Sequence, residues 1–230
     1  MSRGGKRGKG RPTQPPAPQG SRPAGAVASG ARSGARPAPG ARKPPAASRE
    51  RVPMELARPV FFVGFMGAGK TSVARRLARQ CSVAAVDMDS YLERREGRRV
   101  KEIFADVGEE GFRAIETDVL GELAAKEPLL ISCGGGVILR EENRAILDEG
   151  GFVVYLRVTA DEAASRISDL STRPLFDDLD AARARCEERL PLYEAVADVT
   201  VDTAGKGVAA IAREVQRLLE KEGVLCRQPR

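Results

Sequence analysis

Residues 64–71 read Gly-Phe-Met-Gly-Ala-Gly-Lys-Thr and directly follow an apolar run, Pro-Val-Phe-Phe-Val, at residues 59–63. The stretch matches the phosphate-binding pattern G-x-x-x-x-G-K-[ST], and helical spacing of apolar residues begins just after it. Its glycines let several backbone N–H groups point at one phosphate, and the positive end of the following helix adds to the field. In this pattern Lys70 reaches the β- and γ-phosphates and the Thr71 hydroxyl ligates Mg²⁺. The stretch therefore predicts a nucleoside triphosphate site between a strand and a helix.

Apolar runs alternate with helical patterns along the rest of the chain. The further apolar runs lie at residues 83–86, 128–132, 152–156 and 199–201, and the helical stretches at 110–126, 140–148, 160–168, 180–195 and 206–222. Short, nearly continuous apolar runs are typical of parallel strands covered on both faces, so the alternation predicts an open α/β sheet between two layers of helices. Ligands bind at the carboxyl ends of such strands. We therefore expect residues 64–71, Asp87, Asp89 and residues 134–136 to meet in one cleft.

Composition separates a basic N-terminal segment from the remainder. Residues 1–49 contain nine Pro, nine Gly and eleven Lys or Arg, with no Asp, Glu or aromatic residue. The whole chain has a net charge of +6, so residues 50–230 carry −5. A segment of this composition cannot bury enough apolar surface to offset its ordering entropy. We expect a disordered tail over residues 1–57, one folded domain over 58–223 and a short C-terminal tail over 224–230.

The basic tail has three interpretations, which the sequence leaves open. It is a solvated extension, or a start assigned upstream of a true start at Met54; it makes weak non-specific contact with nucleic acid or another polyanion; or it is an organelle transit peptide. Few serines and many prolines argue against the last. No secretory segment and no apolar run long enough to span a membrane is present, which predicts a cytoplasmic protein without membrane contact.

The cysteines and the absence of histidine exclude several kinds of site. Cys81, Cys133, Cys186 and Cys226 are far apart in the sequence, and the chain has no histidine. Zinc sites of the Cys/His type and Ser/His or Cys/His catalytic pairs are therefore excluded. We expect reduced, structural thiols.

Asp87 and Asp89 follow a predicted strand and admit two interpretations. In extended geometry both side chains leave the same face, so that one could serve Mg²⁺ and the other a phosphoryl acceptor. Alternatively, they form the N-cap and acidic first turn of a helix. Likewise, Arg113 and Glu116 could form a simple surface pair three residues apart.

Several motifs taken together resemble the shikimate kinase family. They are the loop at 64–71, Asp87-x-Asp89, Phe104 with Gly108-Glu109-x-x-Phe112-Arg113-x-x-Glu116, Gly134-Gly135-Gly136, Arg173-Pro174-Leu175 and Arg189-x-Pro191-Leu192-Tyr193. Their order and spacing extend through nearly all of residues 58–220. The resemblance implies ATP-dependent phosphorylation of the 3-hydroxyl of shikimate to shikimate 3-phosphate, with ADP release, in aromatic amino acid biosynthesis. It also implies a P-loop kinase with a five-stranded parallel sheet and a mobile lid at about residues 170–184.

The resemblance assigns roles on the nucleotide side. Lys70 holds the transferring phosphate, Thr71 and Asp87 serve Mg²⁺, and Arg173 swings over the phosphates from the lid. The residues implied to bind ATP are Gly67, Ala68, Gly69, Lys70, Thr71, Ser72, Arg166 and Arg173. Two departures from the family pattern stand out: the segment between Arg173 and Arg189 is a few residues short, and residues 202–206 lack a proline often found facing the adenine.

On the acceptor side, the resemblance makes Asp89 the candidate base and places Arg113 and Arg189 on the shikimate carboxylate. A guanidinium suits this role because its fork matches a carboxylate bidentately. The residues implied to bind shikimate are Asp89, Phe104, Phe112, Arg113, Glu116, Gly134, Gly135, Gly136 and Arg189. Glu116 would orient Arg113, and the two phenylalanines would wall the ring.

Other functions remain as alternatives. A gluconate-type metabolite kinase shares the fold and the phosphate loop, and a non-catalytic regulator could use the basic tail. No exposed heptad or apolar stripe predicts oligomerisation, so we expect a monomer.

Overall fold

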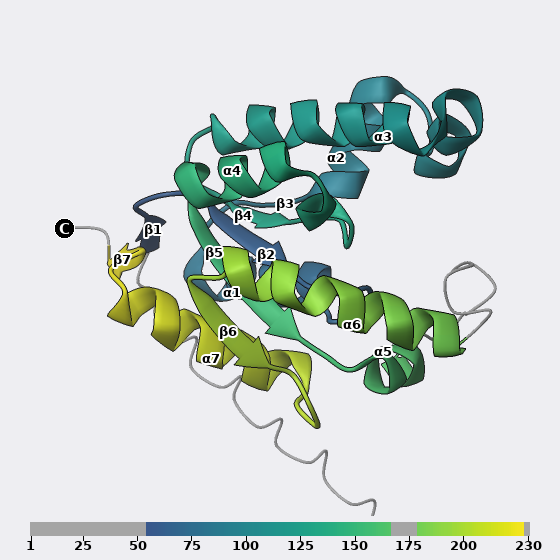
Figure 1. Ribbon diagram of the computed structural model, residues 1–230. Helices are drawn as coiled ribbons and strands as arrows, with labels where there is room; N and C mark the ends of the chain where they lie inside the picture. The colour runs from purple at the N-terminus through teal and green to yellow at the C-terminus, as the bar shows by residue number, and fades with distance from the viewer. Residues whose placement is uncertain (1–53, 167–178, 228–230) are drawn as a thin grey trace, which may run out of the picture. The chain divides into compact units, whose positions relative to one another are not determined.

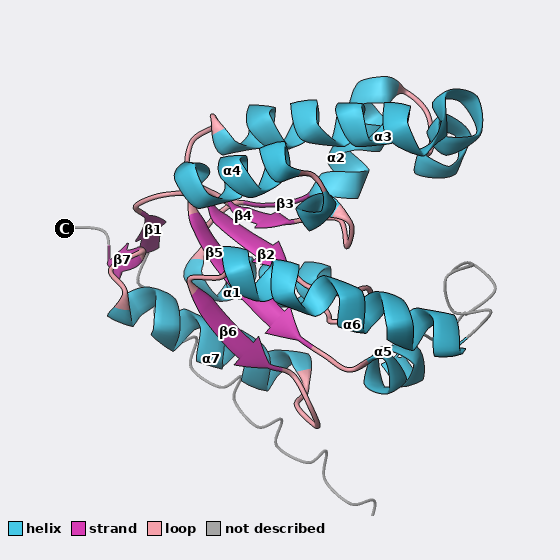
Figure 2. Ribbon diagram, viewed as in Figure 1, coloured by secondary structure: helices cyan, strands magenta, loops and turns pink. Residues whose placement is uncertain are grey.

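A five-stranded parallel sheet forms the centre of the protein. The computed structural model describes residues 54–166 and 179–227. The strands of the sheet are β2 Val60–Val63, β3 Ala85–Asp87, β4 Leu130–Ser132, β5 Phe152–Arg157 and β6 Val199–Asp202. Their order is β3-β4-β2-β5-β6, and every neighbouring pair is parallel (Figure 2). All five runs that were predicted as strands lie in this sheet, and the predicted fold class is confirmed.

Helices cover both faces of the sheet (Figure 1). They are α1 Lys70–Cys81, α2 Met88–Glu96, α3 Val100–Ala124, α4 Glu141–Gly150, α5 Ala160–Arg166, α6 Leu179–Val196 and α7 Val208–Lys221, with a 3₁₀ turn at Val137–Leu139. Helices α1 and α7 pack against each other on one face, and α4 and α6 pack against β5 on the other. The chain runs from β2 to β3 in one direction along the sheet and then from β3 through β4 to β5 in the opposite direction. Because crossovers between parallel strands are right-handed, the helices that connect these two runs lie on opposite faces.

Burial explains why the central strands read as continuous apolar runs. Each residue of β2 is fully buried, and β4 is buried throughout. The edge strands differ: Ala85 in β3 is exposed, and β6 alternates between exposed and covered positions. The prediction that helices cover both faces of every strand therefore holds for the centre of the sheet and not for its edges.

The folded part extends further at both ends than the predicted boundaries. Strand β1, Met54–Leu56, pairs antiparallel with β7, Leu225–Arg227, and Ala57 donates a backbone hydrogen bond to Val224. The boundaries at 57/58 and 223/224 thus cut through ordered structure. Three-residue strands carry no usable periodicity, and these two form because burial of Leu56, Val224 and Leu225 ties them to the core. Residues 1–53 of the predicted basic tail lie outside the described residues.

Helix α3 is longer than predicted and has a break. The expected helix at 110–126 is its second part, and Gly108 interrupts the helix with φ +70°. Most of the predicted lid, including Arg173, lies outside the described residues; its last part, from Leu179, begins α6. Among the described helices, none has the length and apolar character to cross a bilayer.

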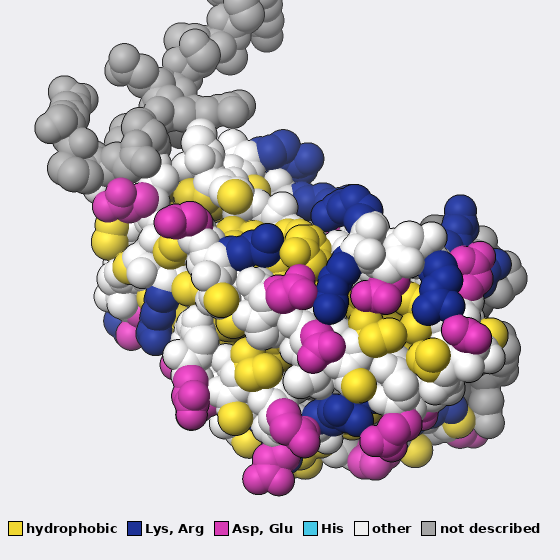
Figure 3. Space-filling model, turned by 90° about the horizontal axis from the view of Figure 1, so that it is seen from above, with side chains coloured by type: hydrophobic (Ala, Val, Ile, Leu, Met, Phe, Trp, Pro, Cys, Tyr) yellow, Lys and Arg dark blue, Asp and Glu magenta, His cyan; other side chains and the backbone are white. Residues whose placement is uncertain are grey.

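Charged side chains of both signs are interspersed on the face shown in Figure 3. This mixture agrees with the charge division in the sequence, in which residues 50–230 carry nearly balanced charge and the excess of cations belongs to the N-terminal segment.

Candidate functional site

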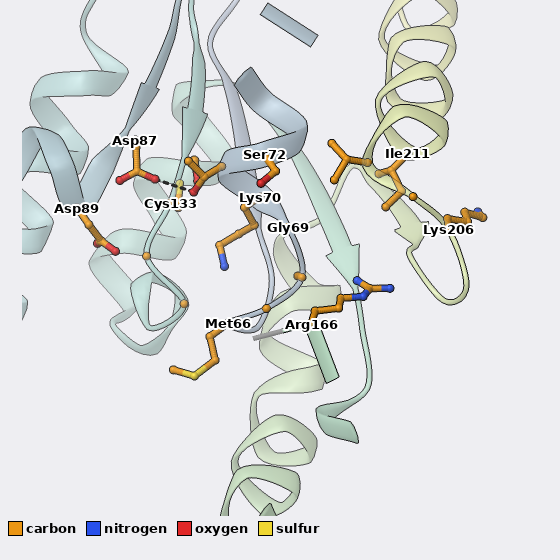
Figure 4. Close-up of a pocket in the computed structure, with 18 residues that line it drawn as sticks. Met66, Gly69, Lys70, Ser72, Asp87, Asp89, Cys133, Arg166, Lys206 and Ile211 are labelled. Atoms are coloured by element: carbon orange, nitrogen blue, oxygen red, sulfur yellow. Dashed lines mark hydrogen bonds between the residues drawn. The ribbon is translucent and has the colours of Figure 1, made fainter. Parts of the chain in front are cut away.

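A cleft of about 800 Å³ opens at the carboxyl ends of the strands (Figure 4). Of the predicted site residues, its lining includes residues 67–72, Asp87, Asp89, Gly134, Gly135 and Arg166. The phosphate loop follows β2, Asp87 ends β3, and the glycines follow β4. The predicted meeting of these segments in one cleft is confirmed.

The phosphate loop requires glycine where its backbone turns and where α5 approaches. Gly67 has φ +78°, and Gly69, which caps α1, has φ +90°. A Cβ built on Gly67 would lie 2.8 Å from the carbonyl oxygen of Ala163. Lys70 folds back over the loop, where its Nζ donates to the carbonyl oxygens of Gly64 at 2.7 Å and Phe65 at 3.1 Å. The lysine is therefore held directly above the turn that would surround a phosphate.

Thr71, Asp87 and Ser132 form a cluster of oxygen ligands beside the loop. The Thr71 hydroxyl donates to Asp87 Oδ2 at 2.7 Å and lies 3.0 Å from Ser132 Oγ. Although burial raises the pKa of Asp87, hydrogen bonds from Thr71 and Ser90 outweigh this effect and lower the pKa. Asp87 is therefore ionised near neutral pH. An ionised carboxylate and hydroxyl oxygens are ligands that suit Mg²⁺, so the residues present fit this ion.

Both interpretations of Asp87 hold at once. Its Oδ1 accepts from the backbone N–H and the hydroxyl of Ser90 and so caps α2, while its Oδ2 faces Thr71. The extended geometry expected for the pair is wrong, because α2 begins at Met88 and Asp89 lies in its first turn. Asp89 still lines the cleft, because the first turn of α2 leaves β3 at the same edge of the sheet.

Arg113 and Glu116 form a buried ion pair on α3 rather than a surface pair. Arg113 Nη1 donates to Glu116 Oε2 at 2.7 Å, and Glu116 is only 2% exposed. Burial raises the pKa of Glu116, and the positive charge of Arg113 partly opposes the rise. Arg113 Nε is buried and has no hydrogen-bond partner among the described residues, which is unusual for a buried donor. Phe104 and Phe112 stack beside the pair with ring centroids 4.1 Å apart.

The glycine triplet is surrounded by the acceptor-side residues. A Cβ built on Gly134 would lie 2.8 Å from Glu116 Oε1 and 3.2 Å from Asp89 Oδ1. A Cβ on Gly136 would lie 2.6 Å from both terminal nitrogens of Arg113. A side chain at either position would displace these charged groups. The structure thus brings α2, α3 and the triplet together, although they are far apart in the sequence.

Helix α6 reaches the same triplet. Arg189 Nη1 donates to the carbonyl oxygen of Gly135 at a long distance, 3.4 Å. Arg113 and Arg189, which were predicted to share one ligand carboxylate, therefore lie at adjacent glycines of the triplet.

The far end of the cleft contains the predicted nucleotide-side residue Arg166 and three residues that were not predicted. Arg166 donates to the Thr203 hydroxyl at 2.9 Å and to its carbonyl oxygen at 2.6 Å, which fixes the guanidinium. Lys206, Val208 and Ile211 also line the cleft. Lys206 and Ile211 lie across the phosphate loop from Asp87 and Asp89 (Figure 4). These three follow β6, so the rule that ligands bind beyond the carboxyl ends of strands could have found them. The same rule applies to Ser132, the last residue of β4.

The thiol of Cys133 also lines the cleft. Burial raises the pKa of this thiol, so it is neutral and a poor nucleophile at neutral pH. Cys81 is buried as well, and no disulfide joins cysteines in the described part of the chain. These observations agree with a structural role for the buried cysteines.

Comparison with known proteins gives a consistent family assignment. The family model described as shikimate kinase matches residues 66–220. The shikimate kinase of Ralstonia nicotianae is 42% identical over 170 residues, which cover 72% of this chain and 89% of the relative. That of Chromobacterium violaceum is 41% identical over 171 residues, covering 72% and 92%.

Solved structures agree with the sequence relatives. The shikimate kinase from Acinetobacter baumannii in complex with shikimate superposes with a TM-score of 0.68 at 34% identity, covering 72% of this chain and 94% of that one. A gluconokinase from Sinorhizobium meliloti, at 23% identity and a TM-score of 0.50, shows likeness of fold alone. The phosphate loop, the buried Arg113–Glu116 pair and the glycine triplet are thus found in a chain that belongs to the shikimate kinase family.

Proposed function

We propose that this chain transfers the γ-phosphoryl group of ATP to the 3-hydroxyl of shikimate and releases shikimate 3-phosphate and ADP. The observation that carries the proposal is the acceptor side of the cleft. There Arg113, a half-buried arginine beside the glycine triplet that borders the cleft, is oriented by Glu116 and has a buried, unpartnered Nε–H. A ligand that supplies an acceptor would satisfy this buried donor. The neighbouring structure from Acinetobacter baumannii holds shikimate, a carboxylate ligand of this kind.

On the nucleotide side, the loop at 64–71 surrounds the β- and γ-phosphates with backbone N–H groups. Lys70 exchanges its bonds to the loop carbonyls for the transferring phosphate. Thr71 and Asp87 would hold Mg²⁺, whose chemical contribution is to neutralise charge on the phosphates. Arg166, with Lys206, Val208 and Ile211, would contact the base at the far end of the cleft.

On the acceptor side, Asp89 would accept the proton of the 3-hydroxyl as the new phosphorus–oxygen bond forms and the bond to the β-phosphate bridge breaks. The negative charge then leaves on ADP. Arg113 and Arg189 would bind the shikimate carboxylate, and Phe104 and Phe112 would wall the ring. The role of Arg173, a monomeric state and a cytoplasmic location stay predictions.

A coupled assay of ADP release with Mg·ATP tests the proposal. Shikimate, quinate, gluconate and AMP are compared as acceptors with the full-length chain. Turnover with shikimate that far exceeds the other three supports the assignment. Preferential turnover of gluconate would instead favour the gluconate-type alternative, and ATP binding without turnover of any acceptor would contradict a catalytic role.

A further inference from the structure

Tyr193 is a buried tyrosine whose hydroxyl reaches the glycine triplet. It lies on α6, is 1% exposed, and donates a short hydrogen bond to the carbonyl oxygen of Gly135. Its ring stacks on Tyr155 of β5, with centroids 5.2 Å apart and ring planes 15° apart. Burial raises the pKa of the phenol, so the hydroxyl keeps its proton and acts as a donor. The stacked ring and this hydrogen bond join α6, the sheet and the triplet.

The carbonyl oxygen of Gly135 is shared between two side chains of α6. Arg189 and Tyr193 are four residues apart, so they lie on one face of the helix. Arg189 Nη1 makes a long contact of 3.4 Å with the oxygen, whereas the Tyr193 hydroxyl makes a short one. Because the Tyr193 hydroxyl already satisfies the carbonyl, the contact from Arg189 is a secondary one.

Gly135 connects the two halves of the cleft. A Cβ built on it would lie 3.6 Å from the backbone nitrogen of Met66 and 3.8 Å from the carbonyl oxygen of Gly64, both in the phosphate loop. The neighbouring glycines instead approach the acceptor-side charges of Asp89, Glu116 and Arg113. The orientation of the Gly135 peptide therefore affects how the acceptor side meets the phosphate loop.

We propose that Tyr193 is a positioning residue: its hydroxyl holds the Gly135 carbonyl, so that Arg189 keeps only a long contact with this oxygen, which a substrate carboxylate can replace. This inference rests on the proposed role of Arg189. When the hydroxyl is removed, Arg189 Nη1 is the side-chain donor that still contacts this carbonyl. The guanidinium then turns toward Gly135, and the acceptor binds more weakly although no residue that touches it has changed.

Tyr193→Phe tests the proposal, with Tyr155→Phe as the matched control. Both variants keep a buried ring in the same stack and lose one hydroxyl. For Tyr193→Phe we expect the shikimate KM to rise about tenfold, the size of effect when a charge-assisted hydrogen bond is weakened. The KM for ATP should stay within about twofold, and Tyr155→Phe should change neither value. Equal effects of the two variants, or an equal rise of both KM values, would overturn the proposal.

A double-mutant cycle with Arg189→Ala tests the route through the arginine. In the Arg189→Ala background, Tyr193→Phe should no longer raise the shikimate KM, because residues that act through one another are not additive. Independent, multiplicative effects would overturn the inference and leave the proposed function intact. If Arg189→Ala alone left the shikimate KM unchanged, the carboxylate role of Arg189 would fail and the inference with it. Absence of shikimate turnover in the unaltered chain would contradict the proposed function itself.

Discussion

Replacing Arg113 by Ala separates substrate binding from folding stability. The guanidinium has two proposed roles: it neutralises Glu116, whose side chain is 3% exposed, and it carries a buried, unpartnered Nε–H that a ligand would satisfy. Arg113→Ala removes both at once. Adding Glu116→Gln removes the stranded charge and leaves the loss of the ligand contact. Comparing Arg113→Ala with Arg113→Ala/Glu116→Gln therefore separates the two roles.

The expected magnitudes follow from burial. Leaving one partner of a buried ion pair uncompensated costs about 3–5 kcal/mol of folding free energy. Arg113 keeps 14% of its side chain exposed, so we expect the lower end, about 3 kcal/mol. Glu116→Gln in the same chain should recover at least half of this loss. The lost hydrogen bonds to a carboxylate, about 1.5–3 kcal/mol, correspond to a rise of about 10- to 150-fold in the shikimate KM. This rise should be equal in both variants.

The stranded carboxyl group also predicts a pH dependence. Burial already raises the pKa of Glu116, and without Arg113 nothing nearby offsets that effect to the same extent. A group whose pKa is raised on folding stabilises the protein below its unfolded pKa, and that stability is lost as pH rises through the folded pKa. Arg113→Ala should therefore lose more stability at about pH 8 than at about pH 5, relative to the unaltered chain. Glu116→Gln should remove that difference.

Urea unfolding at the two pH values and steady-state kinetics with both substrates measure these effects. If the second substitution restored the shikimate KM, the weaker shikimate binding of Arg113→Ala would be an effect of misfolding and not of a lost ligand contact. An equal rise of the KM for ATP and the KM for shikimate would likewise rule out a specific contact between Arg113 and shikimate. Glu116→Gln alone is the control, since its amide oxygen can still accept from Arg113.

Three further substitutions test other parts of the site. Asp89→Asn should lower kcat about 10²-fold with unfolding free energy unchanged, and near-normal turnover would remove Asp89 from the role of base. Gly67→Ala should lower nucleotide affinity about tenfold or more in a binding titration, because the new Cβ would meet Ala163 and the backbone has a positive φ. Gly97→Ala is the control, since Gly97 has a similar φ and open space around its Cβ position. An equal loss of affinity in the control would exclude the clash with Ala163 as the cause. The pKa of Asp87 is lowered on folding, so its stabilisation is present above the unfolded value of about 3.9 and is lost as pH falls. Asp87→Asn should therefore flatten the acid limb of stability measured between about pH 3 and 6, and an unchanged limb would contradict the lowered pKa.

The features that the sequence did not predict are short elements and single residues, whose positions depend on contacts with distant parts of the chain. The strand β1, Met54–Leu56, and its partner β7 are too short for a periodic signal, and pairing between the two chain ends stabilises them. Helix α2 begins one residue after Asp87, so alternation along a strand could not describe the position of Asp89. Ser132 escaped notice because a lone serine at a strand end has no distinctive pattern until Thr71 is placed beside it.

The phosphate loop, the five parallel strands and the family could be predicted from the amino-acid sequence alone. These features are local: a glycine-rich turn, continuous apolar runs and motif spacing are written in consecutive residues. Which interpretation of each charged residue holds depends instead on how the helices and the sheet pack together. Arg113 and Glu116 have the spacing of a surface pair, yet packing of α3 against α4 and of the triplet against α3 buries them. Burial changes the energy of a charge far more than sequence spacing does, and burial depends on residues that are distant in the chain.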